Sequence, residues 1–199
     1  MQIFTIGHST HPIERFVALL RTLSVEVLAD VRSTPFSRFN PQFNRERLAT
    51  SLAGAGIRYE FMGETLGARS TDPACIENGR VSYARLAESA PFKRGVEHLI
   101  DIAGTQRVAI MCAEKEPTDC HRTILVGRAL ERAGFEVRHI LADGSVEENR
   151  QTMERLVEQL GLPAEDLFSA GPERFEAAYE QQGARMAYSP GKASARKKP

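Results

Sequence analysis

Short apolar runs alternate with stretches of helical periodicity along this chain. The short runs predict buried β-strands at 2–6, 25–31, 57–62, 107–112 and 136–141. Apolar residues at helical spacing predict helices at 12–23, 45–53, 81–88, 91–103, 120–133, 146–160 and 172–182. Strands alternating with helices predict an α/β fold with a mainly parallel sheet, helices on both of its faces and a three-layer, Rossmann-like architecture.

Residues 1–182 are expected to form a single domain, followed by a basic, disordered tail at 183–199. The tail holds five of the 26 basic residues and none of the 26 acidic ones, so residues 1–182 carry a net charge of −5. Two segments inside the domain, 32–44 and 63–80, are predicted as loops because they are rich in Pro, Gly, Ser and Asn.

The composition is that of a soluble globular protein, with 42% hydrophobic and 26% charged residues. No apolar run approaches the roughly 20 residues that cross a bilayer, and the first residues do not resemble a signal peptide. Three cysteines are too few for a disulfide framework. We therefore expect a cytoplasmic protein with free thiols and no membrane partner.

Polar residues gather where the predicted strands end. His8 follows the first strand, Asp30 and Arg32 end the second, and the segment 112–122 follows the strand at 107–112. Ligands of parallel α/β sheets bind at the carboxyl ends of the strands. These segments, distant in sequence, are therefore predicted to share one pocket.

Three motifs carry a resemblance to a known family: TIGHST at 5–10, DVRSTPFSRFN at 30–40 and MCAEKEPTDCHR at 111–122. With these motifs the chain resembles the bacterial and archaeal family named domain of unknown function 488. The resemblance implies an α/β fold and a motif-lined pocket. It implies no reaction, so the chemistry has to come from the residues.

Arginines near the strand ends favour an anionic ligand, because guanidinium groups are permanent, fork-shaped donors suited to phosphate. The candidate substrate-binding residues are Arg32, Ser37, Arg38 and Arg122. Arg122 also lies at the start of a predicted helix, where backbone N–H groups favour anions. Alternatively, Arg32 pairs with Asp30 or Glu114 and only ties loops together.

Carboxylates, histidines and a thiol at the same edge are candidates for proton transfer or nucleophilic chemistry. The candidate catalytic residues are His8, Asp30, Glu114, Cys120 and His121. Each also has a structural interpretation: the carboxylates can cap a helix or orient an arginine, and the histidines can serve as hydrogen-bonding groups.

The two cysteines of the third motif allow two further hypotheses. Cys112, Cys120, His121 and His8 could form a soft metal site, but the spacing lacks the usual short ligand pairs. We therefore assign no metal ligand, and a divalent metal remains a possible cofactor. The other hypothesis is a reactive thiolate. Cys120 is the better candidate because it precedes His121 and Arg122 at a helix start, whereas Cys112 is expected to be a buried structural residue.

The loop at 32–47 interleaves phenylalanines with arginines, which is typical of a surface for single-stranded nucleic acid. The alternative is that its phenylalanines anchor the loop to the core. The chain contains neither a dinucleotide-binding fingerprint nor a P-loop.

The leading hypothesis is an enzyme, a hydrolase or transferase, acting on a phosphate-bearing substrate. That substrate would be a nucleotide or a nucleic acid. The alternative is a non-catalytic module that binds the same ligands, and a third hypothesis is thiol or sulfur-transfer chemistry at Cys112 or Cys120.

Overall fold

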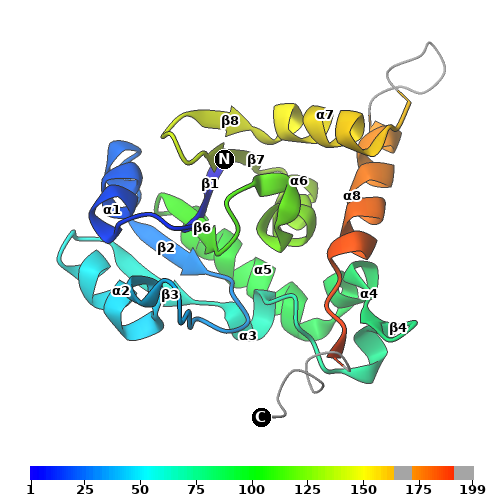
Figure 1. Cartoon of the computed structure of the whole chain (residues 1–199), viewed down its shortest axis with the longest axis horizontal. Helices are drawn as coiled ribbons and strands as arrows, with labels where there is room; N and C mark the ends of the chain where they lie inside the picture. Colours follow the sequence, from blue (N-terminus) through cyan, green and yellow to red (C-terminus); the bar gives the residue numbers. More distant parts are fainter. Residues whose placement is uncertain (164–171, 191–199) are drawn as a thin grey trace.

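The computed structural model describes residues 1–163 and 172–190 of the 199-residue chain (Figure 1). The strands in these residues are β1 (Gln2–Gly7), β2 (Val27–Asp30), β3 (Arg58–Phe61), β4 (Ile76–Glu77), β5 (Arg80–Val81), β6 (Val108–Cys112), β7 (Glu136–Ile140) and β8 (Val146–Glu148). The α-helices are α1 (Ile13–Thr22), α2 (Arg45–Ala53), α3 (Gly63–Leu66), α4 (Tyr83–Glu88), α5 (Ala90–Ala103), α6 (Arg128–Arg132), α7 (Asn149–Leu160) and α8 (Pro172–Met186). Short 3-10 turns cover Pro41–Phe43, Pro73–Cys75 and Pro117–Asp119, and a π-helical segment covers Arg122–Gly127.

Six strands form one sheet in the order β3-β2-β6-β1-β7-β8. Every neighbouring pair is parallel except β7 and β8, which are antiparallel. All the residues of β2 and β6 are buried, which explains why these strands read as continuous apolar runs rather than as alternating ones. The predicted mainly parallel sheet is confirmed.

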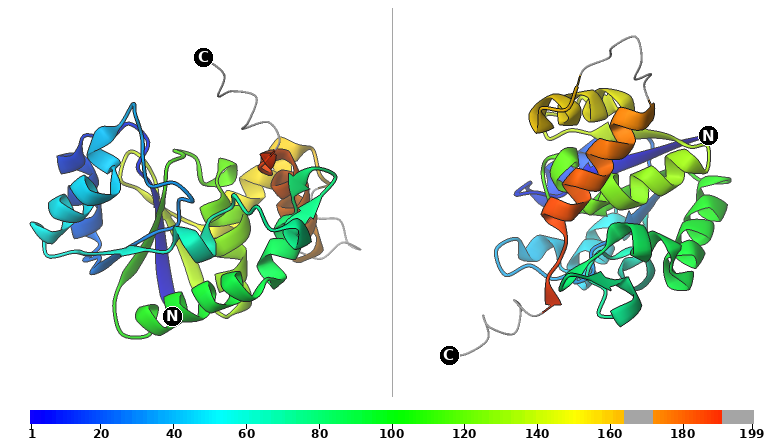
Figure 2. Two further views of the ribbon diagram at one scale, coloured as in Figure 1. Left: turned by 90° about the horizontal axis from the view of Figure 1, so that it is seen from below. Right: turned by 90° about the vertical axis from the view of Figure 1, so that its right-hand side faces the viewer.

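Helices pack on both faces of this sheet, as predicted (Figure 2). On one face, Phe16 and Leu20 of α1 and Leu48 of α2 join a buried cluster with Phe4 and Met111 of the sheet. On the other face, α5 and α6 belong to a second cluster that contains side chains of β1, β2, β6 and β7. The α/β fold with three layers is therefore confirmed. None of the described helices is long and apolar enough to cross a membrane.

The helix predicted at 120–133 is not a continuous α-helix, since Arg122–Gly127 is π-helical and α6 covers only Arg128–Arg132. Two further predicted segments also differ from the observed elements. Residues 146–148, predicted as the start of a helix, form the edge strand β8 because they pair with Arg138–Ile140 of β7, and α7 begins only at Asn149. The predicted loop at 63–80 contains α3 and the hairpin β4–β5. Strand β8 forms by pairing with residues that lie outside the helical pattern. Helix α3 and the hairpin β4–β5 are too short to leave a periodic pattern in the sequence.

Ordered structure continues past residue 182, where the boundary between domain and tail is predicted. Helix α8 continues to Met186, and Ala187 is buried. The backbone of Tyr188 accepts a hydrogen bond from Val81 N (2.8 Å). Apolar side chains at 186–188 thus attach the start of the basic segment to the domain. The remainder of the predicted tail, 191–199, lies outside the described residues.

Candidate functional site

The three sequence motifs meet at the carboxyl edge of the sheet. Strands β2, β6 and β1 are neighbours and parallel, so their carboxyl ends emerge side by side. The pairing of β1 with β6 continues past both strands, because His8 N donates to Cys112 O (2.9 Å) and Ser9 N to Ala113 O (3.0 Å). The predicted convergence of the motifs is therefore observed.

A pocket of about 460 Å³ opens where these strands end. Most of its lining side chains are polar, and they come from all three motifs and from the loop after α3. The lining residues are His8, Ser9, Thr10, Arg32, Ser33, Thr34, Phe36, Ser37, Asn40, Ala68, Arg69, Cys112, Ala113, Glu114 and His121. Several hydroxyl groups and two guanidinium groups therefore face one space that a small ligand could fill.

Arg32 is a buried residue of the pocket wall, held by a carboxylate beneath it. Its Nε and Nη2 donate to the two oxygens of Asp30 (2.9 and 2.6 Å), and Nη2 also donates to Phe43 O (2.8 Å). Asp30 is fully buried and receives a further bond from the Tyr59 hydroxyl (2.7 Å). Asp30 therefore orients Arg32, as the structural alternative supposed, and it does not itself line the pocket.

His8 lies between Arg32 and Phe43. Its ring stacks on Phe43 at 4.3 Å, Nδ1 lies 2.9 Å from Ser9 O, and Nε2 lies 3.3 Å from Arg32 Nη1. These contacts assign the proton to Nδ1 and leave Nε2 as an acceptor. Burial, together with the positive charge of Arg32, lowers the pKa of His8 to about 4. His8 is therefore neutral at pH 7.

Arg122 holds the loop that follows β6. It is fully buried, and its guanidinium donates to Glu114 O (2.7 Å), Lys115 O (3.1 Å) and the Thr5 hydroxyl (3.4 Å). The same loop crosses directly over Gly7, where a Cβ would lie only 1.9 Å from Glu114 O. Glycine at the end of β1 and arginine after the loop thus fix its path.

The structure separates the four predicted substrate-binding residues. Arg32 and Ser37 line the pocket. The guanidinium of Arg122 instead donates to two backbone oxygens and to the Thr5 hydroxyl, so its placement does not support a role in anion binding. Arg38 is exposed, outside the pocket lining, with its guanidinium 5.0 Å from the centre of the Phe39 ring. Only two of the four share the pocket.

The predicted catalytic residues divide in a similar way. His8, Glu114 and His121 line the pocket, while Cys120 is fully buried behind it. Cys112, expected to be a buried structural residue, is buried and also lines the pocket.

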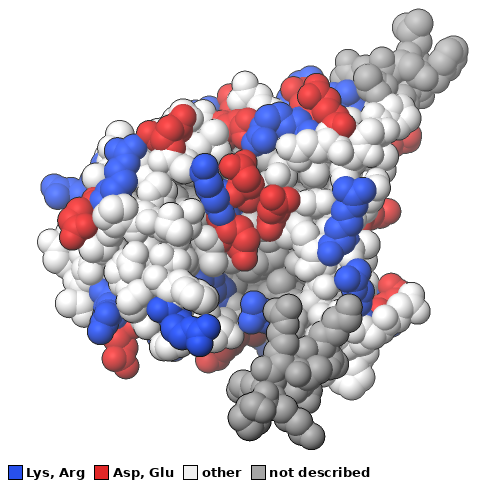
Figure 3. Space-filling model, viewed as in Figure 1, with Lys and Arg blue, Asp and Glu red and all other residues white. Residues whose placement is uncertain are grey.

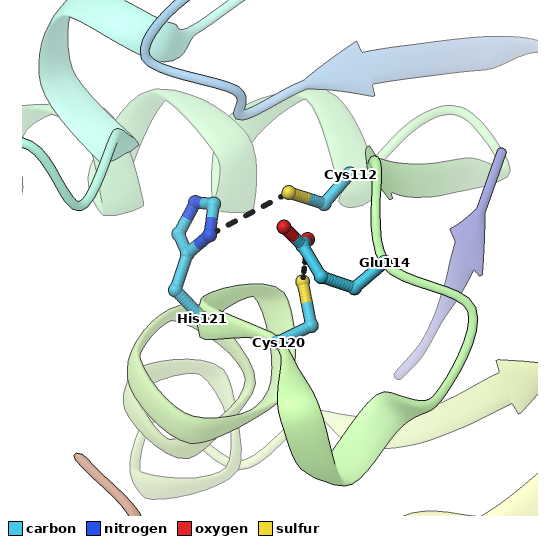
Figure 4. Close-up of side chains that lie close together, drawn as sticks. All are labelled: Cys112, Glu114, Cys120 and His121. Carbon is cyan, nitrogen blue, oxygen red and sulfur yellow. Dashed lines mark hydrogen bonds between the residues drawn. The ribbon is translucent and has the colours of Figure 1, made fainter. Parts of the chain in front are cut away.

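Cys112, Glu114, Cys120 and His121 form one cluster at the floor of the pocket, in which the side chains point toward one another (Figure 4). Cys112 Sγ lies 3.5 Å from His121 Nδ1, and the Cys120 thiol donates to Glu114 Oε2 at 2.9 Å. The other ring nitrogen of His121, Nε2, lies 3.0 Å from Val31 O. One carboxylate, one imidazole and two thiols at these distances are a set that could hold a metal ion.

Burial and mutual contact shift the pKa values of this cluster. Burial and the neighbouring Cys120 raise the pKa of Glu114, and burial raises that of Cys112. Burial also opposes ionisation of Cys120, but its contact with Cys112 and the nearby Arg122 lower its pKa. The pKa values of the two thiols are therefore shifted in opposite directions, upward for Cys112 and downward for Cys120.

Several pocket residues escaped the sequence analysis. Ser33 and Thr34 follow Arg32 directly in the second motif, so their position was a usable signal. Arg69 gave none, because it lies in the segment 63–80, which shows no periodicity. Its backbone N–H donates to the Ser33 hydroxyl (3.1 Å), and this contact between distant segments places it at the pocket.

Comparison with known proteins identifies a family. Neither a search of curated proteins nor a search of solved structures found a match to the chain. Residues 12–129 match the family described as domain of unknown function DUF488, and this range includes all of the second and third motifs. The chain therefore belongs to the DUF488 family.

Proposed function

We propose that the chain is an enzyme, a hydrolase or transferase, that binds a phosphate-bearing substrate in the pocket at the strand ends. The observation that carries the proposal is the state of Arg32. Its guanidinium is already desolvated and oriented by Asp30, while Nη1 lies at the pocket wall beside the neutral His8. A preorganised arginine loses little conformational freedom when it binds a phosphate oxygen.

The residues around Arg32 suit the same ligand. Arg69 adds a second positive charge, and Ser33, Thr34 and Ser37 add hydroxyl donors. Asp30 already pairs with Arg32, whereas the guanidinium of Arg69 lies over the Tyr188 ring at 5.5 Å and forms no ion pair with another described residue. His8 lines the pocket and is the group that would move protons when a metal occupies the adjoining cluster, whereas Glu114 and His121 would take part in proton transfer only in the metal-free site. A divalent metal in the adjoining cluster would be the cofactor.

A nucleotide or nucleic acid is the favoured substrate because aromatic side chains stand at the pocket. Phe36 lines it and is 66% exposed, and Phe39 is 82% exposed next to Arg38. Exposed phenylalanines can stack on nucleobases. The idea that all the phenylalanines of this loop anchor it to the core holds only for Phe43, which is fully buried.

The binding step is tested by thermal unfolding with inorganic phosphate, mononucleotides, and short DNA and RNA strands. A ligand at a hundredfold excess over its dissociation constant should stabilise the wild type by about 2.7 kcal/mol. Arg69→Ala should lose most of this shift, because it removes a positive charge that lines the pocket without touching the Arg32–Asp30 pair. If no phosphate-bearing ligand stabilises the wild type, the proposal is wrong.

Arg21→Ala is the matched control. Arg21 is exposed in the last turn of α1, which returns the chain to the opposite edge of the sheet. This variant should respond to ligands as the wild type does. Equal responses of Arg21→Ala and Arg69→Ala would locate binding outside the pocket.

The exposed Phe36 and Phe39 also favour a second candidate, a module that binds single-stranded nucleic acid without turnover. Basic side chains on the face shown in Figure 3 are interspersed with acidic ones, so stacking would have to contribute strongly to affinity. Phe39→Ala should then weaken salt-sensitive binding of an oligonucleotide. Val146→Ala, which changes an exposed apolar residue of β8, should not. Bound ligand that is never converted to product would favour this module over the enzyme.

A further inference from the structure

The four donor atoms of Cys112, Glu114, Cys120 and His121 all lie within 4.8 Å of one another. Around one tetrahedral zinc ion, with bonds of roughly 2.0–2.3 Å, ligand atoms lie about 3.3–3.8 Å apart. The distance of 3.5 Å between Cys112 Sγ and His121 Nδ1 falls in this range. The cluster therefore needs only a small contraction to surround an ion.

The local fold explains how an unusual ligand spacing produces this cluster. Cys112 ends β6, and the chain then turns back through the 3-10 turn Pro117–Asp119 to deliver Cys120 and His121 to the same point. Arg122 fixes the intervening loop through its carbonyl oxygens. The sequence lacks the usual closely spaced ligand pairs, but the loop held by Arg122 brings the separated ligands together in space.

The orientation of His121 is that of a metal ligand. Its Nε2–H donates to Val31 O at 3.0 Å, which leaves Nδ1 without a proton. Nδ1 faces Cys112 Sγ, and Figure 4 shows this contact as a dashed line. Metal-binding histidines characteristically donate their second ring N–H to a backbone carbonyl or a carboxylate, which fixes both the tautomer and the ring. Val31 O performs this task from the end of β2.

We propose that Cys112, Cys120 and His121 bind one Zn²⁺, with Glu114 as the fourth ligand. Two thiolates and an imidazole favour zinc over the hard ions Mg²⁺ and Ca²⁺, which prefer oxygen ligands. Binding replaces the thiol protons of Cys112 and Cys120, which are released to solvent, so the site becomes a dithiolate held by the ion.

The ion is accessible from the pocket side. Cys120 is fully buried, but Cys112, Glu114 and His121 all line the pocket. Glu114 belongs to a loop and is exposed as a whole residue, although its carboxyl group contacts the buried Cys120, so it is the ligand that water or a substrate oxygen can replace. An exchangeable position facing a pocket is the mark of a catalytic rather than a structural zinc site. The zinc site does not depend on the substrate class proposed above.

The experiment is metal binding to the full chain, without substrate and without added histidine tags. After chelation and removal of the chelator, the wild type should take up one Zn²⁺ or Co²⁺ per chain. The cobalt form should show the thiolate-to-metal charge-transfer absorption expected for two cysteine ligands in tetrahedral geometry. Absence of metal uptake by the chelated wild type, with its fold intact by circular dichroism, would overturn the proposal.

Variants then assign the ligands. Cys112→Ser and Cys120→Ser should each lose tight uptake and half of the charge-transfer intensity, whereas Cys75→Ser should behave as the wild type. Cys75 is the matched control because it is also buried and free, but lies outside the cluster. Glu114→Gln should keep the charge-transfer band while its visible absorption changes with the fourth ligand.

A redox pair of thiols is the competing explanation for two cysteines in one cluster. It predicts a disulfide between Cys112 and Cys120 under mild oxidation, whether or not zinc is present. The zinc proposal predicts that bound zinc protects both thiols from oxidation and from alkylation. Equal modification of Cys112 and Cys120 with and without zinc would therefore contradict it. All these readouts are independent of phosphate binding, so either proposal can fail alone.

Discussion

Arg32 and Arg122 are both buried at the carboxyl edge of the sheet, but the groups around them differ in kind. Arg32 faces a charged partner, the fully buried carboxylate of Asp30. Arg122 faces neutral oxygens: two backbone carbonyls and the hydroxyl of Thr5. Sequence alone assigned both arginines to an anionic ligand. The first lies at the pocket wall with a buried carboxylate as its partner, and the second holds a loop.

The polar groups beyond each arginine differ as well. Behind Arg32, Asp30 also accepts a hydrogen bond from the Tyr59 hydroxyl, and among the described residues no side-chain hydrogen bond continues beyond Tyr59. Behind Arg122, the Thr5 hydroxyl contacts His139 Nδ1 (2.8 Å), and His139 Nε2 contacts Asn149 Oδ1 (2.8 Å). Asn149 then donates to the Tyr179 hydroxyl (2.7 Å) of α8. A chain of neutral hydrogen bonds therefore connects the loop after β6 to the last helix.

The sharpest test of this comparison is to replace each arginine by methionine. In Arg32→Met, the carboxylate of Asp30 remains buried without its charged partner, so unfolding in urea should show a loss of about 3–5 kcal/mol. Adding Asp30→Asn should recover much of this loss, because the buried charge is then removed. A loss below about 1 kcal/mol would mean that the ion pair contributes little to the fold.

Arg122→Met should cost less, about 2 kcal/mol, because it strips hydrogen bonds from neutral oxygens, and water can reach the exposed loop at 114–115. The same urea titration measures it. Faster proteolysis within residues 113–119, at a site that the wild type protects, should accompany the loss. If Arg122→Met proves more costly than Arg32→Met, the distinction between charged and neutral partners is wrong.

His139 provides a test by pH. Burial first, and the charge of Arg122 in addition, lower the pKa of His139 from 6.5 to about 4. Between these two pKa values the unfolded chain binds a proton at His139 that the folded chain does not. The stability that neutral, buried His139 gives the fold is therefore fully present above pH 6.5 and is lost as the pH falls. From pH 7 to pH 5 the wild type should lose about 2 kcal/mol through this group, and His139→Gln should not show that part.

The imidazole pKa itself can be followed by NMR. In Arg122→Met, the pKa of His139 should rise, since one nearby positive charge is gone, and the pH-dependent loss of stability should become shallower. An unchanged pKa would show that burial alone accounts for the shift.

Tyr59→Phe is the smallest of these changes. It removes one hydrogen bond to a carboxylate that keeps Arg32, and the free energy of unfolding should fall by about 1–1.5 kcal/mol. In the Arg32→Met background the phenol is the main remaining side-chain donor to Asp30 among the contacts described, so the same change should cost more there. A double-mutant cycle measures this coupling, and purely additive costs would argue against a shared network.

The sheet was predictable because buried parallel strands leave unbroken apolar runs, and the rule that ligands bind at their carboxyl ends brought His8, Arg32 and the third motif together. The edge strand β8 was not predictable, since Val146–Glu148 fits the helical periodicity of the residues that follow and becomes a strand only by pairing with β7.

Side-chain direction was the main limit at the site. Sequence favoured Cys120 because it precedes a helix, but the direction in which β6 ends turns Cys112 toward the pocket and leaves Cys120 behind it. Likewise, Arg122 lies two residues after Cys120 at the start of a predicted helix. The neighbouring residues in the sequence do not reveal that its guanidinium donates to the carbonyl oxygens of the preceding loop. Such contacts depend on the path of the loop in space.

Gly7 has a consequence for the tolerance of this chain to mutation. Because a single added carbon would overlap Glu114 O, every codon change that replaces this glycine displaces the loop that carries Glu114 and precedes Cys120. In a library of variants selected for activity of the pocket, substitutions at position 7 should therefore be depleted as strongly as substitutions of a catalytic residue. Intolerance to substitution at this position would reflect how closely two backbone segments cross, and it would not show that Gly7 takes part in the reaction.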